Sequence, residues 1–273
     1  MQTFKLPGHE DSLLPDGNWN LVWNDEFDGT ELDRTKWDYR LSMMGKRHPA
    51  WTDKAVHLDG NSNAVFDIIL EDGNPVSSQL QTGYNFMDEP VQRTKFGNDD
   101  LQWPIGKLKK DLFTHTYGYY ECRCRLTQYP ETWWSAFWMQ SPIIGATLDP
   151  ADSGTELDIM ECFKPGEIAA HYTHTSGYGL DRVSIGDGGL KGLDQTAFHR
   201  FGMLWDKKGY TFYIDGVENG KVNTSVSHRP EFILISTEVH GYRHETHKAV
   251  PKAFEIIGKD NFLVDYVRVF DQV

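Results

Sequence analysis

Three acidic residues lie close together in the segment 155–163, which reads TELDIMECF. Side chains on a regular strand alternate between faces, so Glu156 and Asp158 share one face and Glu161 falls on the other. The second face also carries apolar residues suited to a core, where an unpaired carboxylate is costly. We therefore predict a β-bulge near Met160, because one extra residue returns Glu161 to the face of the other two carboxylates.

Two carboxyl groups on one face suit the hydrolysis of a glycosidic bond. A retaining glycosidase holds an ionised nucleophile and a protonated acid about 5–5.5 Å apart. With the bulge, Glu156 and Glu161 lie roughly 13 Å apart between Cα atoms, a gap that two long side chains can largely close. Asp158 lies between them and helps to keep their ionisation states different. The alternative interpretation is a solvated acidic strand, with or without bound Ca²⁺.

The elements around this segment read as short strands. Asp-Gly turn signals recur along the chain, and runs rich in Val, Ile, Phe, Tyr and Trp lie between them. This pattern, without a helical period, favours an all-β sandwich or barrel. In the last run, 262–270, regular alternation places Phe262, Val264 and Arg268 on the same face.

Two long stretches, 42–62 and 84–111, carry no strand pattern. Loops of this length in a compact domain are usually functional or mobile. They contain Trp51 and Trp103, which we predict to form walls of a binding cleft.

Composition excludes several classes of protein. The 273 residues carry a net charge of −13, which disfavours binding to nucleic acid or to an anionic membrane surface. No segment approaches the roughly 20 apolar residues that span a bilayer. The first residues have no apolar signal-peptide core, so we expect either a cytoplasmic protein or a signal that has been removed. Cys122, Cys124 and Cys162 do not form a disulfide framework, and we predict buried thiols.

Five further segments extend the pattern around the acidic strand. Glu-Leu-Asp-Ile-Met-Glu resembles the ExDxxE signature of glycoside hydrolase family 16. Other segments resemble that family in the expected order: NLVWNDEFDGTELDRTKW, YGYYECRCRL, TWWSAFWM, FHRFGMLWDKKGYTFYIDG and VDYVRVF. The resemblance covers about residues 18–271. It implies a concanavalin-like jelly-roll β-sandwich of two antiparallel sheets with a concave substrate cleft.

The resemblance also implies a role for each acidic residue. Glu156 matches the nucleophile, Glu161 the general acid/base and Asp158 the assisting carboxylate. Trp134 and Trp138 match tryptophans that bind sugar around the cleavage point.

A histidine on the strand after the catalytic one is also implied, beside the nucleophile. His174 is our first choice for it and His171 the second. No catalytic cofactor is expected. A structural Ca²⁺ on the convex side is implied, with Glu26, Gly29 and Asp265 as its ligands.

The resemblance implies a retaining endo-β-glycanase that acts by double displacement. No linker divides the chain, so we expect one catalytic domain over 1–273, with the core sandwich at about 18–271 and an N-terminal extension at 1–17. We expect a monomer that is secreted, periplasmic or on the cell surface, because a polysaccharide cannot enter the cell intact.

The choice of polysaccharide rests on departures from the family pattern. The sequence before the nucleophile is ADSG, where β-1,3-glucanases usually have Trp-Pro-x-x-Gly, and WSAFWMQSP replaces WPAIWML. Both departures favour a red-algal galactan of the agar, porphyran or carrageenan type over β-1,3-glucan. Cationic contacts to a charged galactan would come from loop-like segments that hold Arg47, His48, Arg93, Lys95, Arg182, Arg243, His244 and His247. The alternatives are a laminarinase with the same mechanism, a transglycosylase, and a lectin-like binding protein on the same fold.

Overall fold

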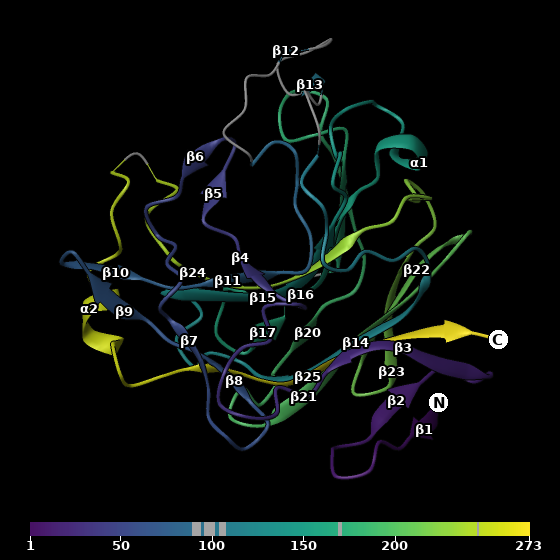
Figure 1. The fold of residues 1–273 in the computed structure, drawn as a ribbon, viewed down its shortest axis with the longest axis horizontal. Helices are drawn as coiled ribbons and strands as arrows, with labels where there is room; N and C mark the ends of the chain where they lie inside the picture. The colour runs from purple at the N-terminus through teal and green to yellow at the C-terminus, as the bar shows by residue number, and fades with distance from the viewer. Residues whose placement is uncertain (89–93, 96–101, 104–107, 169–170, 245) are drawn as a thin grey trace.

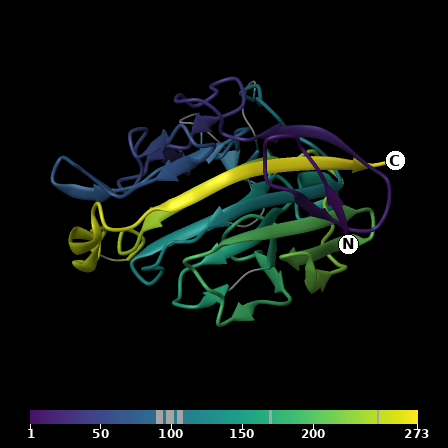
Figure 2. The same ribbon diagram turned by 90° about the horizontal axis from the view of Figure 1, so that it is seen from below.

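The computed structural model describes residues 1–88, 94–95, 102–103, 108–168, 171–244 and 246–273. Two large sheets stacked face to face form the bulk of this part of the chain (Figures 1 and 2). Neighbouring strands within both sheets are antiparallel. This architecture confirms the predicted all-β jelly-roll sandwich.

The first sheet, here called the cleft sheet, carries the acidic segment. Its strands in spatial order are β19 (Val183–Gly186), β18 (Tyr172–Thr175), β16 (Glu156–Cys162), β15 (Trp133–Gln140), β24 (Phe232–Val239), β11 (Gln79–Gln81) and β4 (Asp38–Tyr39).

The second sheet, here called the back sheet, covers the inner face of the first. Its strands in spatial order are β23 (Val217–Val222), β22 (Gly209–Ile214), β21 (Phe198–Asp206), β14 (Gly118–Arg125), β25 (Phe262–Gln272), β8 (Ala64–Phe66) and β7 (Val56–Leu58), with β3 (Trp19–Asp25) also paired to β25.

Smaller elements decorate the two sheets. The two-stranded pairs are β1 (Gln2–Phe4) with β2 (Ser12–Leu14), β5 (Ser42–Met43) with β6 (Lys46–Arg47), β9 (Ile69–Glu71) with β10 (Asn74–Val76), β12 (Thr94–Lys95) with β13 (Gln102–Trp103), and β17 (Glu167–Ile168) with β20 (Leu190–Lys191). The described residues form two short helices, α1 (Pro150–Ser153) and α2 (Lys252–Ile256). Neither is long enough to cross a bilayer.

The core lies between the two sheets and follows the strand period of two. In β15, Trp133 and Phe137 are fully buried in the core, whereas Trp134 and Trp138 face the cleft. The three cysteines are buried and unpaired, as predicted: Cys122, Cys124 and Cys162.

The last strand, β25, departs from the regular alternation predicted for it. Arg123 of β14 lies opposite Tyr266, and the next residue, Cys124, lies opposite Val264. Asp265 is therefore an extra residue at a β-bulge, and the side chains after it change face.

The bulge explains how a strand of a packed sheet can carry a buried arginine. Regular alternation placed Arg268 beside Phe262 and Val264, and this expectation is wrong. Arg268 instead lies on the outer face of the back sheet, fully buried beneath the N-terminal segment. Its guanidinium pairs with Glu26 and donates to the Ser12 hydroxyl at 2.8 Å.

The N-terminal extension packs on the same outer face. Leu14 is buried with Tyr119 and Phe270, and Phe4 packs against this group. Both termini lie at the same end of the sandwich (Figures 1 and 2).

Candidate active site

A bulge in β16 places the acidic residues. Phe137 of β15 lies opposite Met160, and the next residue, Trp138, lies opposite Asp158. The extra residue is Ile159, one position before the predicted one. Both Ile159 and Met160 pack in the core, and Glu161 returns to the cleft face. The structure therefore confirms the bulge and its effect on the carboxylates.

The start of β16 is held by a buried carboxyl group. Glu231 Oε1 accepts hydrogen bonds from the Thr155 amide at 2.8 Å and from its hydroxyl at 3.0 Å. Burial raises the pKa of Glu231 to about 8. Gly154 packs beside this contact with φ +76°, and a Cβ there would lie 2.3 Å from Ser141 Cβ. These contacts fix the backbone just before Glu156.

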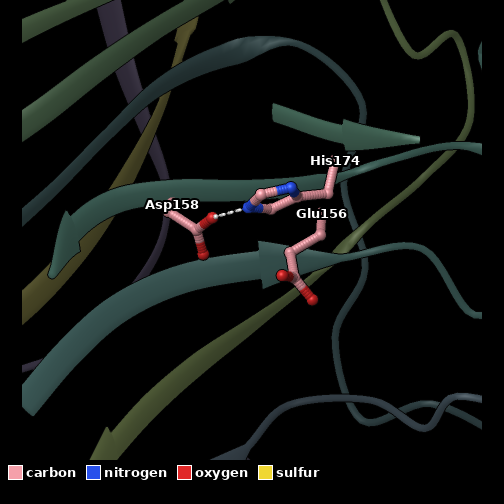
Figure 3. A group of neighbouring side chains, drawn as sticks. All are labelled: Glu156, Asp158 and His174. Atoms are coloured by element: carbon pink, nitrogen blue, oxygen red, sulfur yellow. Dashed lines mark ion pairs between the residues drawn. The ribbon is translucent and has the colours of Figure 1, made fainter. Parts of the chain in front are cut away.

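A cleft of about 550 Å³ lies on the outer face of the cleft sheet. Glu156, Asp158 and Glu161 all line it, as do His174 and Trp134. Asp158 is nearly buried at 4% exposure, and the two glutamates are half-buried. Figure 3 shows Glu156 and Asp158 projecting from one strand, with His174 beside them on the neighbouring strand.

Glu156 is held by two hydrogen-bond donors. The Tyr178 hydroxyl donates to Glu156 Oε2 at 2.5 Å, and Gln140 Nε2 donates to the same oxygen at 3.3 Å. Burial and the nearby charge of Glu156 raise the pKa of Tyr178 well above its ordinary value, so this phenol keeps its proton. The two contacts orient the Glu156 carboxyl group as a hydrogen-bond acceptor.

Asp158 and His174 form the second contact of the site. His174 Nε2 lies 3.2 Å from Asp158 Oδ2 (Figure 3). His174 Nδ1 lies 2.7 Å from the Ser184 hydroxyl. One ligand atom each from Glu156, Asp158 and His174 lies within 4.8 Å of the others. Among the described residues of the site, these three side chains have ligand atoms close enough to one another to hold a metal ion.

Electrostatics separate the protonation states of the acidic residues. Burial, followed by the charges of Asp158 and Glu156, raises the pKa of Glu161 well above its ordinary value. Burial and the charge of Glu156 also raise the pKa of Asp158. A carboxyl that keeps its proton at neutral pH can act as a general acid. Glu161 has the electrostatics of the acid and Glu156 the contacts of the base or nucleophile.

The cleft floor is aromatic, since Trp134 and Trp138 both line it. Trp138 donates its indole N–H to the Ser236 hydroxyl at 2.9 Å, and Trp134 lies beside it on β15, parallel to the His240 ring. Trp51 lines the cleft but is only 2% exposed, and it donates to Glu238 at 3.1 Å. Trp51 therefore supports the floor more than it presents a ring to solvent.

Two ion pairs in the cleft were not predicted from the sequence, although Arg243 was among the candidate cations. Arg243 binds Glu238 with both arms, at 2.6 and 2.8 Å. Burial alone would raise the pKa of Glu238, but Arg243 outweighs it and the net shift is downward. Arg40 pairs with Asp88 at 2.7 Å and lies 5.2 Å from the centre of the Trp138 ring. Arg243 lies in the loop five positions after Glu238, and Arg40 and Asp88 are 48 positions apart, so strand periodicity predicts neither pair.

With the geometry established, comparison with known proteins identifies the family. A family model described as the GH16 domain of β-porphyranases A–D matches residues 19–272. The chain belongs to glycoside hydrolase family 16. Membership places it among the glycoside hydrolases.

Relatives within family 16 differ in their described substrates. A glucan endo-1,3-β-glucosidase of Niallia circulans is 26% identical over 93% of this chain, which spans only 38% of that protein. β-Porphyranase B of Zobellia galactanivorans is 27% identical over 79% of this chain and 72% of its own length. The crystal structure of a laminarinase from Rhodothermus marinus superposes with a TM-score of 0.64 at 21% identity, covering 94% of this chain and 98% of that one.

The two candidate histidines lie on different sides of the cleft sheet. His174 lies in the cleft, opposite Glu156 across the strand pair. His171 lies in the interior, 1% exposed, with its ring stacked on Phe212 and hydrogen-bonded to Asn219. The second choice is therefore wrong, because the odd spacing between the two histidines puts them on opposite faces.

Several residues predicted to contact the substrate either are buried away from it or have side chains that the structure does not describe. The side chain of Trp103 lies outside the described residues, as do those of Arg93 and Lys95. His48 is buried against Trp51, and burial lowers its pKa to about 4, so it is no cation for a substrate. Arg182 and Arg243 do line the cleft.

The residues predicted to bind Ca²⁺ fit the ion poorly. Glu26 is bound by both arms of Arg268, and Asp265 accepts a hydrogen bond from Arg123 at 2.6 Å. Each carboxylate already has a cationic partner, with which a calcium ion would have to compete. Gly29 lies in an exposed turn, and the calcium site remains a prediction.

Proposed function

We propose that this domain is a retaining endo-β-glycanase. The observation that carries the proposal is the bulge at Ile159, which brings Glu156 and Glu161 to one cleft in different electrostatic settings. Glu156 serves as nucleophile and Glu161 as general acid/base. Asp158 and His174 position the nucleophile and the sugar beside it. An aromatic-floored cleft of this size suits several units of a polymer.

The reaction proceeds in two displacements. In the first, a Glu156 oxygen attacks the anomeric carbon, the glycosidic C–O bond breaks, and Glu161 gives its proton to the leaving oxygen. In the second, Glu161 takes a proton from water, whose oxygen attacks the anomeric carbon and releases Glu156. Two inversions give net retention. Tyr178 and Gln140 hold Glu156 Oε2, which leaves Oε1 as the attacking oxygen.

For the substrate we propose a red-algal galactan of the agar, porphyran or carrageenan type. The match to a porphyranase family model and the relative from Zobellia galactanivorans support this class. Arg182 lines the cleft, and within the described part of the chain its guanidinium forms no ion pair. A free cation at this position suits a sulfate ester on the polymer.

The second candidate is an endo-β-1,3-glucanase with the same mechanism. The relative from Niallia circulans and the Rhodothermus marinus structure support that alternative. A non-catalytic lectin is the third candidate, but binding alone gives no reason for a protonated and an ionised carboxyl in one cleft. A transglycosylase would differ only in passing the sugar to an acceptor hydroxyl.

We propose that the enzyme acts as a monomer outside the cytoplasm, where polysaccharide is available. It needs no catalytic cofactor, since two carboxyl groups suffice for double displacement.

A product assay tests the proposed function. The protein is incubated with agarose, porphyran, carrageenans, laminarin, mixed-linkage glucan and xyloglucan, and products are analysed by mass spectrometry, with Glu156→Gln as the control. We expect oligosaccharides from a galactan that are absent with the variant. Products from laminarin alone would overturn the substrate class but keep the mechanism. Binding without products from any polymer would favour the lectin.

A further inference from the structure

The β5–β6 hairpin ends in a two-residue turn, and its first turn residue, Met44, is of a type that such turns disfavour. Ser42 pairs with Arg47 and Met43 with Lys46, so Met44 and Gly45 make the turn. Both have positive φ, +52° and +75°. This is the pattern of a type I′ turn, in which Asn, Asp or Gly is strongly preferred at the first position.

The same chain uses the preferred residue in comparable turns. The β9–β10 hairpin turns at Asp72 (φ +50°) and Gly73 (φ +77°), and the β22–β23 hairpin turns at Asp215 (φ +48°) and Gly216 (φ +76°). Only the hairpin at the cleft carries methionine among these three. A left-handed backbone is strained for a long side chain, and such strain is often kept where function requires it.

The Met44 turn is tied to the floor of the cleft. The Met44 amide donates to Asp88 Oδ1 at 3.1 Å, and Asp88 Oδ2 accepts from Arg40 Nε at 2.7 Å. The Arg40 guanidinium lies 5.2 Å from the centre of the Trp138 ring and 5.5 Å from that of Trp51. The position of the turn is therefore coupled to the surface on which sugar would lie.

The Met44 side chain is exposed to the cleft rather than packed. It is 40% exposed and lines the cleft together with Met43 and Met87. A methionine thioether is flexible and polarisable, adapts to irregular apolar surfaces, and accepts hydrogen bonds only weakly.

We propose that Met44 is a specificity-determining residue that contacts an apolar surface of one sugar unit of the bound polymer. The partner is the C–H face of a pyranose ring, with preference for a unit in which an anhydro bridge or a methyl ether replaces a hydroxyl. Met44 touches substrate but none of the reacting atoms. The inference rests on the proposed function, since it assumes that the polymer lies in this cleft.

The test replaces Met44 with the residue that the turn prefers. In Met44→Asn, we expect the melting temperature to stay unchanged or to rise, because Asn suits the left-handed turn. We expect KM for the polymer to rise about 4-fold for each methylene group that no longer packs against the sugar, with kcat changed much less. Asp72→Met is the matched control: it should lower the melting temperature and leave KM unchanged.

Binding measured without turnover separates this inference from the proposed function. Glu156→Gln and the double variant Glu156→Gln/Met44→Asn are run in native gels that contain each polymer of the product assay. Weaker retardation of the double variant supports the contact, even if no product is ever found. Equal retardation of the two proteins, or no retardation of either, overturns it. Absent products with intact retardation would overturn only the hydrolase proposal.

Discussion

At the scale of single residues, the site depends on three carboxyl groups that differ in their surroundings. Glu156 has two hydrogen-bond donors, whereas Asp158 is nearly buried and Glu161 faces the charges of both. Like charges in one low-dielectric pocket do not all ionise together at neutral pH. The raised pKa of Glu161 suits the proton donor in the proposed double displacement.

Removing the acid should separate the two displacement steps. In Glu161→Ala we expect the rate on polymer to fall by about 10²–10⁴-fold, the usual contribution of a general acid/base. On an aryl glycoside, whose leaving group needs no proton, azide should restore turnover and give a glycosyl azide of retained configuration, because a small anion can attack the covalent intermediate without base assistance. Near-normal activity of Glu161→Ala, measured by reducing-end release, would show that another group is the acid.

The pH profile should respond to Asp158. After burial, the charge of Asp158 is the largest cause of the raised pKa of Glu161. Asp158 and Glu161 both have raised pKa values, and each resists losing its proton once the other is ionised. In Asp158→Asn the second ionising group is absent, so the pKa of Glu161 falls and the acid loses its proton at lower pH. We expect the alkaline limb of the bell-shaped kcat/KM profile to move to lower pH. An alkaline limb that stays in place or moves upward would contradict the assignment.

At the scale of elements, one inserted residue in β16 decides which side chains reach the cleft. The sequence predicted this bulge because regular alternation put Glu161 into the core. The same kind of signal was present in β25, where regular alternation put Arg268 beside Phe262, and its bulge at Asp265 was not predicted. An ionisable residue on an apolar face is thus informative about strand register in both sheets.

Other parts of the site had no local signal in the sequence. Tyr178 comes from a loop and meets Glu156 across 22 positions, and Arg40 meets Asp88 across 48. Such contacts depend on how loops settle over the sheet, which strand periodicity does not encode. The common face of the carboxylates was predictable because Glu161 breaks the period of its strand, whereas the tryptophans of β15 and His174 were predicted from the resemblance to family 16.

Insertion of one alanine between Met160 and Glu161 tests the position that the bulge gives to Glu161. The insertion adds a second extra residue before Glu161, and the alternation of the strand then turns Glu161 from the cleft toward the core, where a carboxylate is costly. We expect loss of detectable hydrolysis and a lower melting temperature. The control is Ile159→Val, which keeps the bulge and should cost about 0.5–1.5 kcal/mol with activity retained. Activity that survives the insertion would contradict the proposed role of the bulge.

At the scale of the whole molecule, a net charge of −13 opposes a polyanionic substrate. Cationic side chains at the cleft, such as Arg182, act locally, whereas the overall repulsion acts over the Debye length of about 10 Å at 0.1 M salt. The N-terminal segment is packed onto the back sheet, because Arg268 of that sheet donates hydrogen bonds to the Glu10 carbonyl and the Ser12 hydroxyl.

Salt should therefore affect charged and neutral polymers differently. Between about 0.01 and 0.15 M NaCl, we expect KM for a sulfated galactan to fall, because screening weakens the long-range repulsion. KM for agarose should change little over the same range. A KM that rises with salt on the sulfated polymer would mean that the local arginine contacts dominate over the net charge.

The stereochemistry of the first product tests the central claim most directly. Hydrolysis of a β-linked polymer that the wild-type protein cleaves is followed by time-resolved proton NMR of the new reducing end, with Glu156→Gln as a blank. Double displacement through Glu156 predicts that the β-anomer appears first and then mutarotates. If the α-anomer appeared first, Glu156 would not be the nucleophile of a covalent intermediate, and the mechanism proposed for this site would be wrong.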